Sequence, residues 1–163
     1  MRTLNIAGLA TIALLIHTAL PAENGPCSSI AGPSILVKVV GLKNRAGTVR
    51  IRVFGGDPKT YFDKKHALKR IEFDAPNSGT VERCIAVAKA GTYAIDVRHD
   101  TNSNGKSDKA DGAGVSGNPE VSLLDIMLKK KPPARKVQIN VSGSATAVSI
   151  IVKYLSGGKL KPA

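Results

Sequence analysis

The stretch "GTYAIDVRH", residues 91–99, alternates apolar and polar side chains along its length. Its apolar positions are Tyr93, Ile95 and Val97, and the charged positions between and after them are Asp96 and Arg98. Successive side chains of an extended chain point to opposite faces of a sheet, so this period of two predicts a β-strand with one buried and one solvated face. The fold class then depends on how often such segments recur.

Strand patterns recur before and after this stretch, at residues 35–42, 48–56, 68–73, 81–88, 136–141 and 147–155. Residues 121–128 fit either a strand or a short helix, and residues 57–70 have the length and composition for one or two helical turns. About seven strands joined by short Gly-, Asn- and Pro-rich turns, without alternating helices, predict an all-β domain. We expect an antiparallel β-sandwich, with a small barrel as the alternative.

The N-terminal segment has the order of a secretory signal peptide. Arg2 provides the charged region, residues 6–16 are apolar, and Ala22 is small enough to precede a cleavage point. A membrane anchor is the alternative, but the apolar run is shorter than the ~20 residues that span a bilayer. We therefore expect a signal peptide over residues 1–22 and a mature chain without a membrane span.

The remaining chain is expected to form one domain. Residues 23–33 are rich in Gly, Ser and Pro and predict an irregular leader. The β-sandwich should cover residues 34–156, followed by a C-terminal tail over residues 157–163. Within the domain, the basic segment 129–136 contains two adjacent prolines, which favour a surface loop; an anion-binding patch is the alternative.

The charge balance is strongly basic. Lys and Arg number 24 against 12 acidic residues, which gives a net charge of +12. Such a surplus favours an anionic neighbour, although bases spread along the chain also serve solubility. Export argues against nucleic acid. The absence of Trp and an aromatic content of only 4% argue against stacking on sugar rings.

The chain contains two cysteines, Cys27 and Cys84. In an exported protein a pair of cysteines is most simply a disulfide, and two buried free thiols are the alternative. A catalytic thiol has less support, because His66 and His99 are the only histidines after cleavage and neither spacing indicates a dyad.

The segment "DTNSNGKSDKAD", which we call the 100–111 loop, places side-chain oxygens at alternate positions. Counted from Asp100, it matches the EF-hand pattern D-x-[DN]-x-[DN]-G-x5-E except that Asp replaces the closing Glu. Calcium takes six to eight oxygen ligands, and a loop of this kind supplies them together with one backbone carbonyl. The expected ligands are Asp100, Asn102, Asn104, the carbonyl of Lys106, Asp108 and Asp111.

The same loop is also compatible with a turn that needs no metal. The Asn104-Gly105 pair favours a type I′ turn, and Asp and Asn side chains readily accept hydrogen bonds from nearby backbone N–H groups. Arg98, Lys106 and Lys109 oppose a divalent cation. A calcium site and a self-bonded turn therefore both remain open from the sequence.

The segments "AGTYAIDVRHDTNSNGKSDKADG" (residues 90–112) and "ILVKVVGLKNRAGTVRIRVF" (residues 35–54) resemble the bacterial domain of unknown function 2141 family. The most specific part is His99-Asp100 joined to Asn102, Asn104, Gly105, Lys106 and Asp108. The chain departs from the family where many members carry a Gly-Ile-Pro segment and a Gly-Phe-Ser-Asn run. The resemblance implies export and a β-sandwich-like fold of the immunoglobulin or transthyretin kind. It implies no activity.

These observations predict a non-catalytic bacterial module, periplasmic or secreted, with calcium as its candidate cofactor and no catalytic residues. The alternative is a protein that binds anionic polymers or glycans of the cell envelope through its basic surface. An enzyme using Asp100 and Asp108 with His99 is disfavoured, because no nucleophile elbow, zinc motif or nucleotide loop accompanies them. His99 continues the apolar face of its strand and is expected to pack there.

Overall fold

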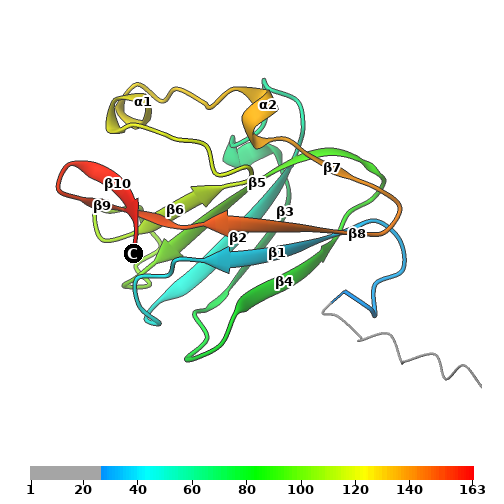
Figure 1. Ribbon diagram of the computed structural model, residues 1–163, viewed down its shortest axis with the longest axis horizontal. Coiled ribbons are helices and arrows are strands. Elements are labelled where there is room, and N and C mark those ends of the chain that lie inside the picture. Colours follow the sequence, from blue (N-terminus) through cyan, green and yellow to red (C-terminus); the bar gives the residue numbers. More distant parts are fainter. Residues whose placement is uncertain (1–26) are drawn as a thin grey trace, which may run out of the picture.

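The computed structural model describes residues 27–163 and contains two β-sheets that share one core (Figure 1). The smaller sheet has the order β4–β1–β8, formed by Val81–Ala86, Ser34–Val40 and Ala145–Ile151. The predicted signal peptide over residues 1–22, and residues 23–26 of the predicted leader, lie outside the described residues. The predicted β-sandwich class is confirmed.

The larger sheet has the order β10–β9–β6–β5–β2–β3, with β7 paired separately to β5. Its strands are, in that order, Lys159–Pro162, Lys153–Ser156, Gly112–Val115, Gly91–Asp100, Thr48–Gly55 and Ala67–Asp74, with β7 at Ile139–Val141. Pairing is antiparallel throughout both sheets except between β1 and β8, which run parallel. The sandwich is therefore mostly antiparallel, as predicted, with one parallel pair.

The core forms where the apolar faces of the strands meet. Side chains of β1, β2 and β5 lie there fully or almost fully buried, among them Val37, Ile51 and Ile95. Each such side chain stabilises the fold by roughly 1.5–3 kcal/mol relative to exposure. The period-two pattern of the sequence therefore predicts the inner face correctly, because alternate positions of each strand point into this layer.

The outer face of β5 differs from the prediction. Asp96 and Arg98 were expected to be solvated, but they are only 8% and 7% exposed. Asp96 pairs with Arg52 of the neighbouring strand, and Arg98 donates to groups of the 100–111 loop that follows its strand. Buried charges of this kind need partners, and the neighbouring strand and the loop provide them.

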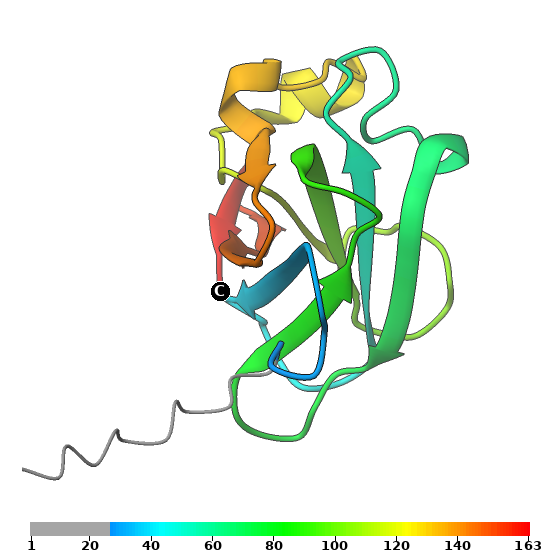
Figure 2. The ribbon, with the colours of Figure 1, turned by 90° about the vertical axis from the view of Figure 1, so that its right-hand side faces the viewer.

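Three short helical segments lie among the strands: the 3-10 helix η1 at Lys64–His66, α1 at Leu123–Met127 and α2 at Ala134–Val137. Figures 1 and 2 both place α1 and α2 at one end of the layers. The ambiguous segment 121–128 therefore contains a helix, which Ser122 and Asp125 cap reciprocally. No helix in the part of the chain that the structure describes is long and apolar enough to cross a membrane.

Two expected segments differ in detail. Residues 136–141 were expected as one strand, but α2 takes its first residues and only Ile139–Val141 pair with β5. Residues 157–163 were expected as a tail, but Lys159–Pro162 form β10 and pair with β9. Strands of three or four residues are too short to show a period of two in the sequence.

The predicted disulfide between Cys27 and Cys84 is present, with the two Cα atoms 5.3 Å apart. It ties the first described residues to β4, beside β1 in the smaller sheet. The segment between Cys27 and β1 contains a turn and bends but no strand, as expected for the leader.

Candidate functional site

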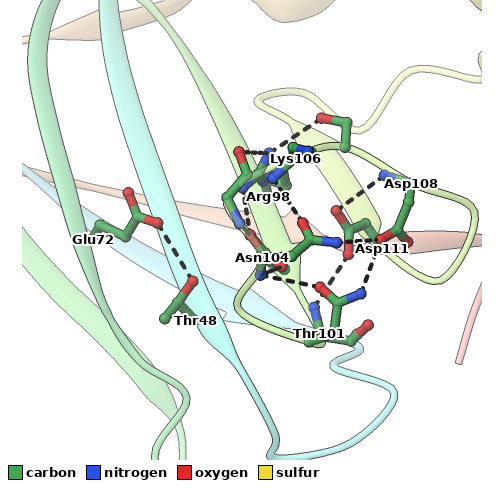
Figure 3. A network of polar contacts seen from close by, with 12 residues as sticks. Thr48, Glu72, Arg98, Thr101, Asn104, Lys106, Asp108 and Asp111 are labelled. Carbon is green, nitrogen blue, oxygen red and sulfur yellow. Dashed lines mark hydrogen bonds and ion pairs between the residues drawn. The ribbon is translucent and has the colours of Figure 1, made fainter.

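The 100–111 loop joins the adjacent antiparallel strands β5 and β6. Asp100 is the last residue of β5, and Gly112, which starts β6, pairs with His99. Both ends of the loop are therefore fixed to one sheet: the first candidate ligand, Asp100, ends β5, and the last, Asp111, directly precedes β6. Figure 3 shows the side chains of this loop turned toward one another in a single polar network.

Asp100 is the buried centre of the turn, with 1% of its surface exposed. Its Oδ1 accepts from the backbone N–H of Asn104 at 3.2 Å, and its Oδ2 accepts from that of Gly105 at 2.9 Å. The Arg98 guanidinium also donates to Oδ2, at 2.6 Å. A carboxylate removed from water requires such partners, and these three fold the chain of the loop back over its own beginning.

Gly105 allows the chain to turn at this point. Its φ is +73°, a left-handed backbone conformation that is energetically unfavourable for residues with a β-carbon. Arg98 lies beneath the turn and donates to Ser107 Oγ at 3.2 Å, in addition to its ion pair with Asp100. Arg98 was expected to oppose a cation. In the structure it neutralises the most buried carboxylate of the loop.

Asp108 is the second centre of the network and is solvent-exposed. Its Oδ2 accepts from the side-chain amides of Asn102 and Asn104, at 3.0 Å each, and its Oδ1 accepts from the backbone N–H of Ala110 at 2.8 Å. These hydrogen bonds, led by that of Ala110, lower the pKa of Asp108 below its ordinary value. The carboxylate is therefore ionised at neutral pH.

Asp111 closes the loop onto its start. Its Oδ1 accepts from the backbone N–H of Thr101 at 3.2 Å, and its Oδ2 accepts from that of Asp108 at 3.3 Å. Lys106 donates its backbone N–H to Asn104 Oδ1 at 2.7 Å. All six predicted metal-ligand residues therefore take part in one hydrogen-bonded network.

The geometry of this network is that of a self-bonded turn. Asn102 and Asn104 each present an amide nitrogen, not an oxygen, to Asp108. Within residues 27–163 no three Asp, Glu, His or Cys side chains converge as a metal-binding group. The donor set nevertheless suits calcium, since it combines three carboxylates with two amides. A cation on Asp108 would replace the two amide N–H donors and require both amides to turn an oxygen toward it.

Beneath the loop lies a buried chain of hydrogen bonds that the sequence did not reveal. His99 has no exposed surface; its Nδ1 lies 2.5 Å from Tyr154 Oη and its Nε2 lies 2.7 Å from the carbonyl of Ala46. Tyr154 Oη also accepts the backbone N–H of Lys43, at 3.0 Å. Because the Ala46 carbonyl can only accept, the partners assign the imidazole proton to Nε2.

The expectation that His99 packs at the end of its strand is confirmed, and both ring nitrogens are occupied there. Gly47 also packs against the start of the 100–111 loop. It has a φ of +78°, and a β-carbon at this position would meet the backbone carbonyl of Asp100 at 1.9 Å. Tyr154 and Gly47 are far from the loop in sequence, so no local pattern could have linked them to it.

A second charged surface covers the outer face of β2 and its neighbours. Arg50 lies opposite Glu72 of β3 and Arg98 of β5. Glu72 and Arg98 are both engaged in other ion pairs, with Arg70 and Asp100. Among the described residues no carboxylate pairs with Arg50. Burial, and then the nearby charge of Arg52, lower the pKa of Arg50. The face therefore has an excess of positive charge at its centre.

Comparison with known proteins finds one family. Its model, described as "Uncharacterized protein conserved in bacteria (DUF2141)", matches residues 37–149 of the chain. This range includes the whole 100–111 loop and most of both sheets. No curated protein and no solved structure matches the chain.

Proposed function

The chain belongs to the DUF2141 family of uncharacterized bacterial proteins, and from that premise we propose that it is an exported, non-catalytic β-sandwich module whose 100–111 loop binds calcium. The observation that carries the proposal is that hydrogen bonds join three carboxylates and two amides of one loop into a single network between adjacent strand ends. The match confirms the predicted family, but the family is uncharacterized and therefore has no known activity with which the proposal can be compared.

The choice of calcium follows from the ligand chemistry. All candidate ligands are oxygens, which hard cations prefer, and calcium accepts six to eight oxygen ligands in variable geometry. Magnesium demands near-ideal octahedral geometry and loses its water reluctantly, so it should bind less well. Thiolate or imidazole ligands, which favour zinc, do not take part, since the cysteines form a disulfide and His99 is buried.

Electrostatics indicates modest affinity. Asp100 already accepts the Arg98 guanidinium, which offsets one of the three negative charges before any ion arrives. Lys106 and Lys109 add positive charge on the same loop. A loop of this charge belongs in the weak, extracellular class, with dissociation constants of about 10⁻⁴–10⁻³ M. Such a site would be filled only where calcium is abundant.

Export and the absence of catalysis rest on separate features. The Cys27–Cys84 disulfide supports an oxidising compartment, where such bonds persist. His99, which could have served Asp100 and Asp108 as a catalytic partner, has no exposed surface and no free ring nitrogen. These two features support a binding or structural module over an enzyme.

Calorimetric titration of calcium into chelator-treated protein tests the proposal. We expect one saturable site per chain, with magnesium much weaker. Asp108→Asn should abolish binding while preserving the shape of the exposed side chain. Asp57→Asn is the matched control, because Asp57 also accepts a backbone N–H in a surface turn, that of Lys59 at 2.9 Å. Equal titrations of the wild type and Asp108→Asn would refute the calcium site.

A second candidate function is the binding of anionic polymers of the cell envelope, and Arg50 is the observation that favours it. An arginine without a carboxylate partner, set among Arg52, Arg70 and Arg98, attracts sulfate or phosphate groups of a polymer. Retention on a heparin resin should fall for Arg50→Gln and stay unchanged for Lys161→Gln, a control on β10. Equal elution of both variants would exclude this surface.

A further inference from the structure

A cavity of about 410 Å³ lies at the end of the molecule that carries α1. Its walls come from β6, β8, β9 and β10 on one side and from α1 and the segment after it on the other. Most of the lining is apolar, including Phe62, Val121, Ile126, Ile151 and Leu160. Figure 1 shows α1 and the β9–β10 hairpin on the same side of the fold.

The charged residues that line this cavity are all basic. They are Lys129, Lys130, Lys131 and Lys153. Lys130 pairs with Asp125 at 3.7 Å, and Lys131 donates to the carbonyl of Lys59 at 3.2 Å and lies over the Tyr61 ring. Among the described residues neither Lys129 nor Lys153 has a carboxylate partner.

Among these four lysines, Lys153 gives the most information about the charge of a ligand. It is half-buried, and its ammonium donates only to the carbonyl of Pro119, at the long distance of 3.4 Å. An ammonium group held in an apolar wall is costly unless an anion or strong acceptors compensate for the lost water. The cavity therefore combines an apolar interior with a lysine ammonium that has no carboxylate partner among the described residues.

The surface beside the cavity is also apolar. Leu124, Met127 and Leu128 are 63%, 78% and 68% exposed, and they flank Ile126, which lines the cavity. The short helix α1 carries Leu124 and Met127 and ends before Leu128; its own capping residues hold it, and none of its side chains is buried. Clustered exposure of large apolar groups is typical of surfaces that contact a ligand or partner.

We propose that this cavity binds a single-chain anionic amphiphile of the fatty-acid class, with its alkyl tail among the apolar residues and its carboxylate on Lys153 and Lys129. The volume lies in the range of small-molecule sites, about 300–1,000 Å³. An anionic head group supplies the missing partner of Lys153, and a cationic or uncharged head group does not. The recessed position of Lys153 favours an inserted molecule over a flat membrane surface or a second copy of the chain.

The test is titration of dodecanoate, below its micelle concentration, against dodecanol and dodecyltrimethylammonium of the same tail length. We expect one dodecanoate site per chain, at least tenfold weaker binding of the alcohol, and no site for the cation. Lys153→Gln should weaken dodecanoate binding at least tenfold. Lys69→Gln, an exposed lysine of β3, should change nothing.

A second variant keeps the test independent of charge. Ala113 lines the cavity and is exposed, so Ala113→Leu should fill the space without disturbing the core and should block all tail binding. Three binding results would overturn the proposal. They are no saturable dodecanoate binding, equal binding of the three amphiphiles, and binding to phosphatidylglycerol vesicles without binding of monomeric dodecanoate. Self-association in ultracentrifugation that Ala113→Leu abolishes would assign the surface to a second copy and would also overturn it.

Discussion

At the scale of single residues, Asp100 and Asp108 have different roles within one loop. Asp100 is buried and accepts two backbone N–H groups and a guanidinium, so it shapes the turn. Asp108 is exposed and holds the two asparagine side chains. Substitution of Asp100 therefore affects the fold of the loop and ion binding together. Substitution of the exposed Asp108 tests ion binding while Asp100 still shapes the turn.

Gly105→Val should destabilise the protein by about 1–2 kcal/mol, because a β-branched residue resists the φ of +73° found there. A β-carbon at Gly105 meets no other atom within 4 Å, so the cost comes from the backbone alone. Urea denaturation measures it. The control is Gly143→Val, at a glycine with equally open surroundings and no positive φ. Equal losses for the two variants would contradict the assigned turn.

The pKa of Asp108 gives a pH prediction. The folded pKa lies below the ordinary value of 3.8, so the ionised carboxylate stabilises the folded state at any pH above that value. As the pH falls below about 3.8, the unfolded chain takes up the proton first and this stabilisation is lost. Asp108→Asn should therefore show a smaller loss of unfolding free energy between pH 5 and pH 3, roughly the window of that titration. Identical pH profiles would show that the hydrogen bonds of Asp108 are not formed in solution.

At the scale of elements, the long strands could be predicted and the short ones could not. β1, β2 and β5 have seven to ten residues, enough for the period of two to appear, and each was expected at nearly its observed place. β6 has four residues with two glycines, and α2 interrupts a pattern that looked like one strand. The parallel pairing of β1 with β8 depends on contacts between residues over a hundred positions apart, which no local pattern encodes.

The candidate site also contains residues that could be predicted from the sequence and residues that could not. The six residues of the 100–111 loop could be predicted because they are neighbours in the sequence. The residues that support the loop could not be predicted, since they come from residues 41–47, which connect β1 to β2, and from β9, and these contact β5 only in the folded protein. Arg98 was correctly placed beside the loop, but its pairing with Asp100 required the burial that the fold creates.

Tyr154→Phe should destabilise the protein by about 1–3 kcal/mol, because it leaves the buried His99 Nδ1 and the Lys43 N–H without their shared partner. Tyr93→Phe is the control: its hydroxyl bonds only the carbonyl of Lys89, at 2.7 Å, in a partly buried position. In chemical denaturation, the free energy of unfolding should therefore be much lower for Tyr154→Phe than for Tyr93→Phe. The reverse order would contradict a structural link between β9 and the base of the loop.

At the scale of the whole molecule, the disulfide and the shared core act together. The Cys27–Cys84 bond closes a segment of 57 residues, and the chain-entropy relation gives it about 4 kcal/mol of stabilisation. The double variant Cys27→Ser, Cys84→Ser should lose about that amount in denaturant unfolding. A reducing agent should lower the stability of the wild type and leave the double variant unchanged. Insensitivity of the wild type to reduction would show that the disulfide is absent in solution.

The proposed calcium site should also act on the whole molecule, since an ion that binds only the folded chain raises its stability by mass action. At a hundredfold excess over the dissociation constant the gain is about 2.7 kcal/mol, and at equality it is about 0.4 kcal/mol. Because the loop ends in two central strands of the larger sheet, this gain should appear in the global transition.

The most direct measurement of the central claim is the melting temperature of the protein in calcium and in chelator. Calcium at 10 mM, about ten to a hundred times the expected dissociation constant, should raise Tm by several degrees. Magnesium should raise it much less, and Asp108→Asn should remove the calcium effect while Asp57→Asn keeps it. Identical melting of the wild type in calcium and in chelator would show that the 100–111 loop is a self-bonded turn and not a metal site.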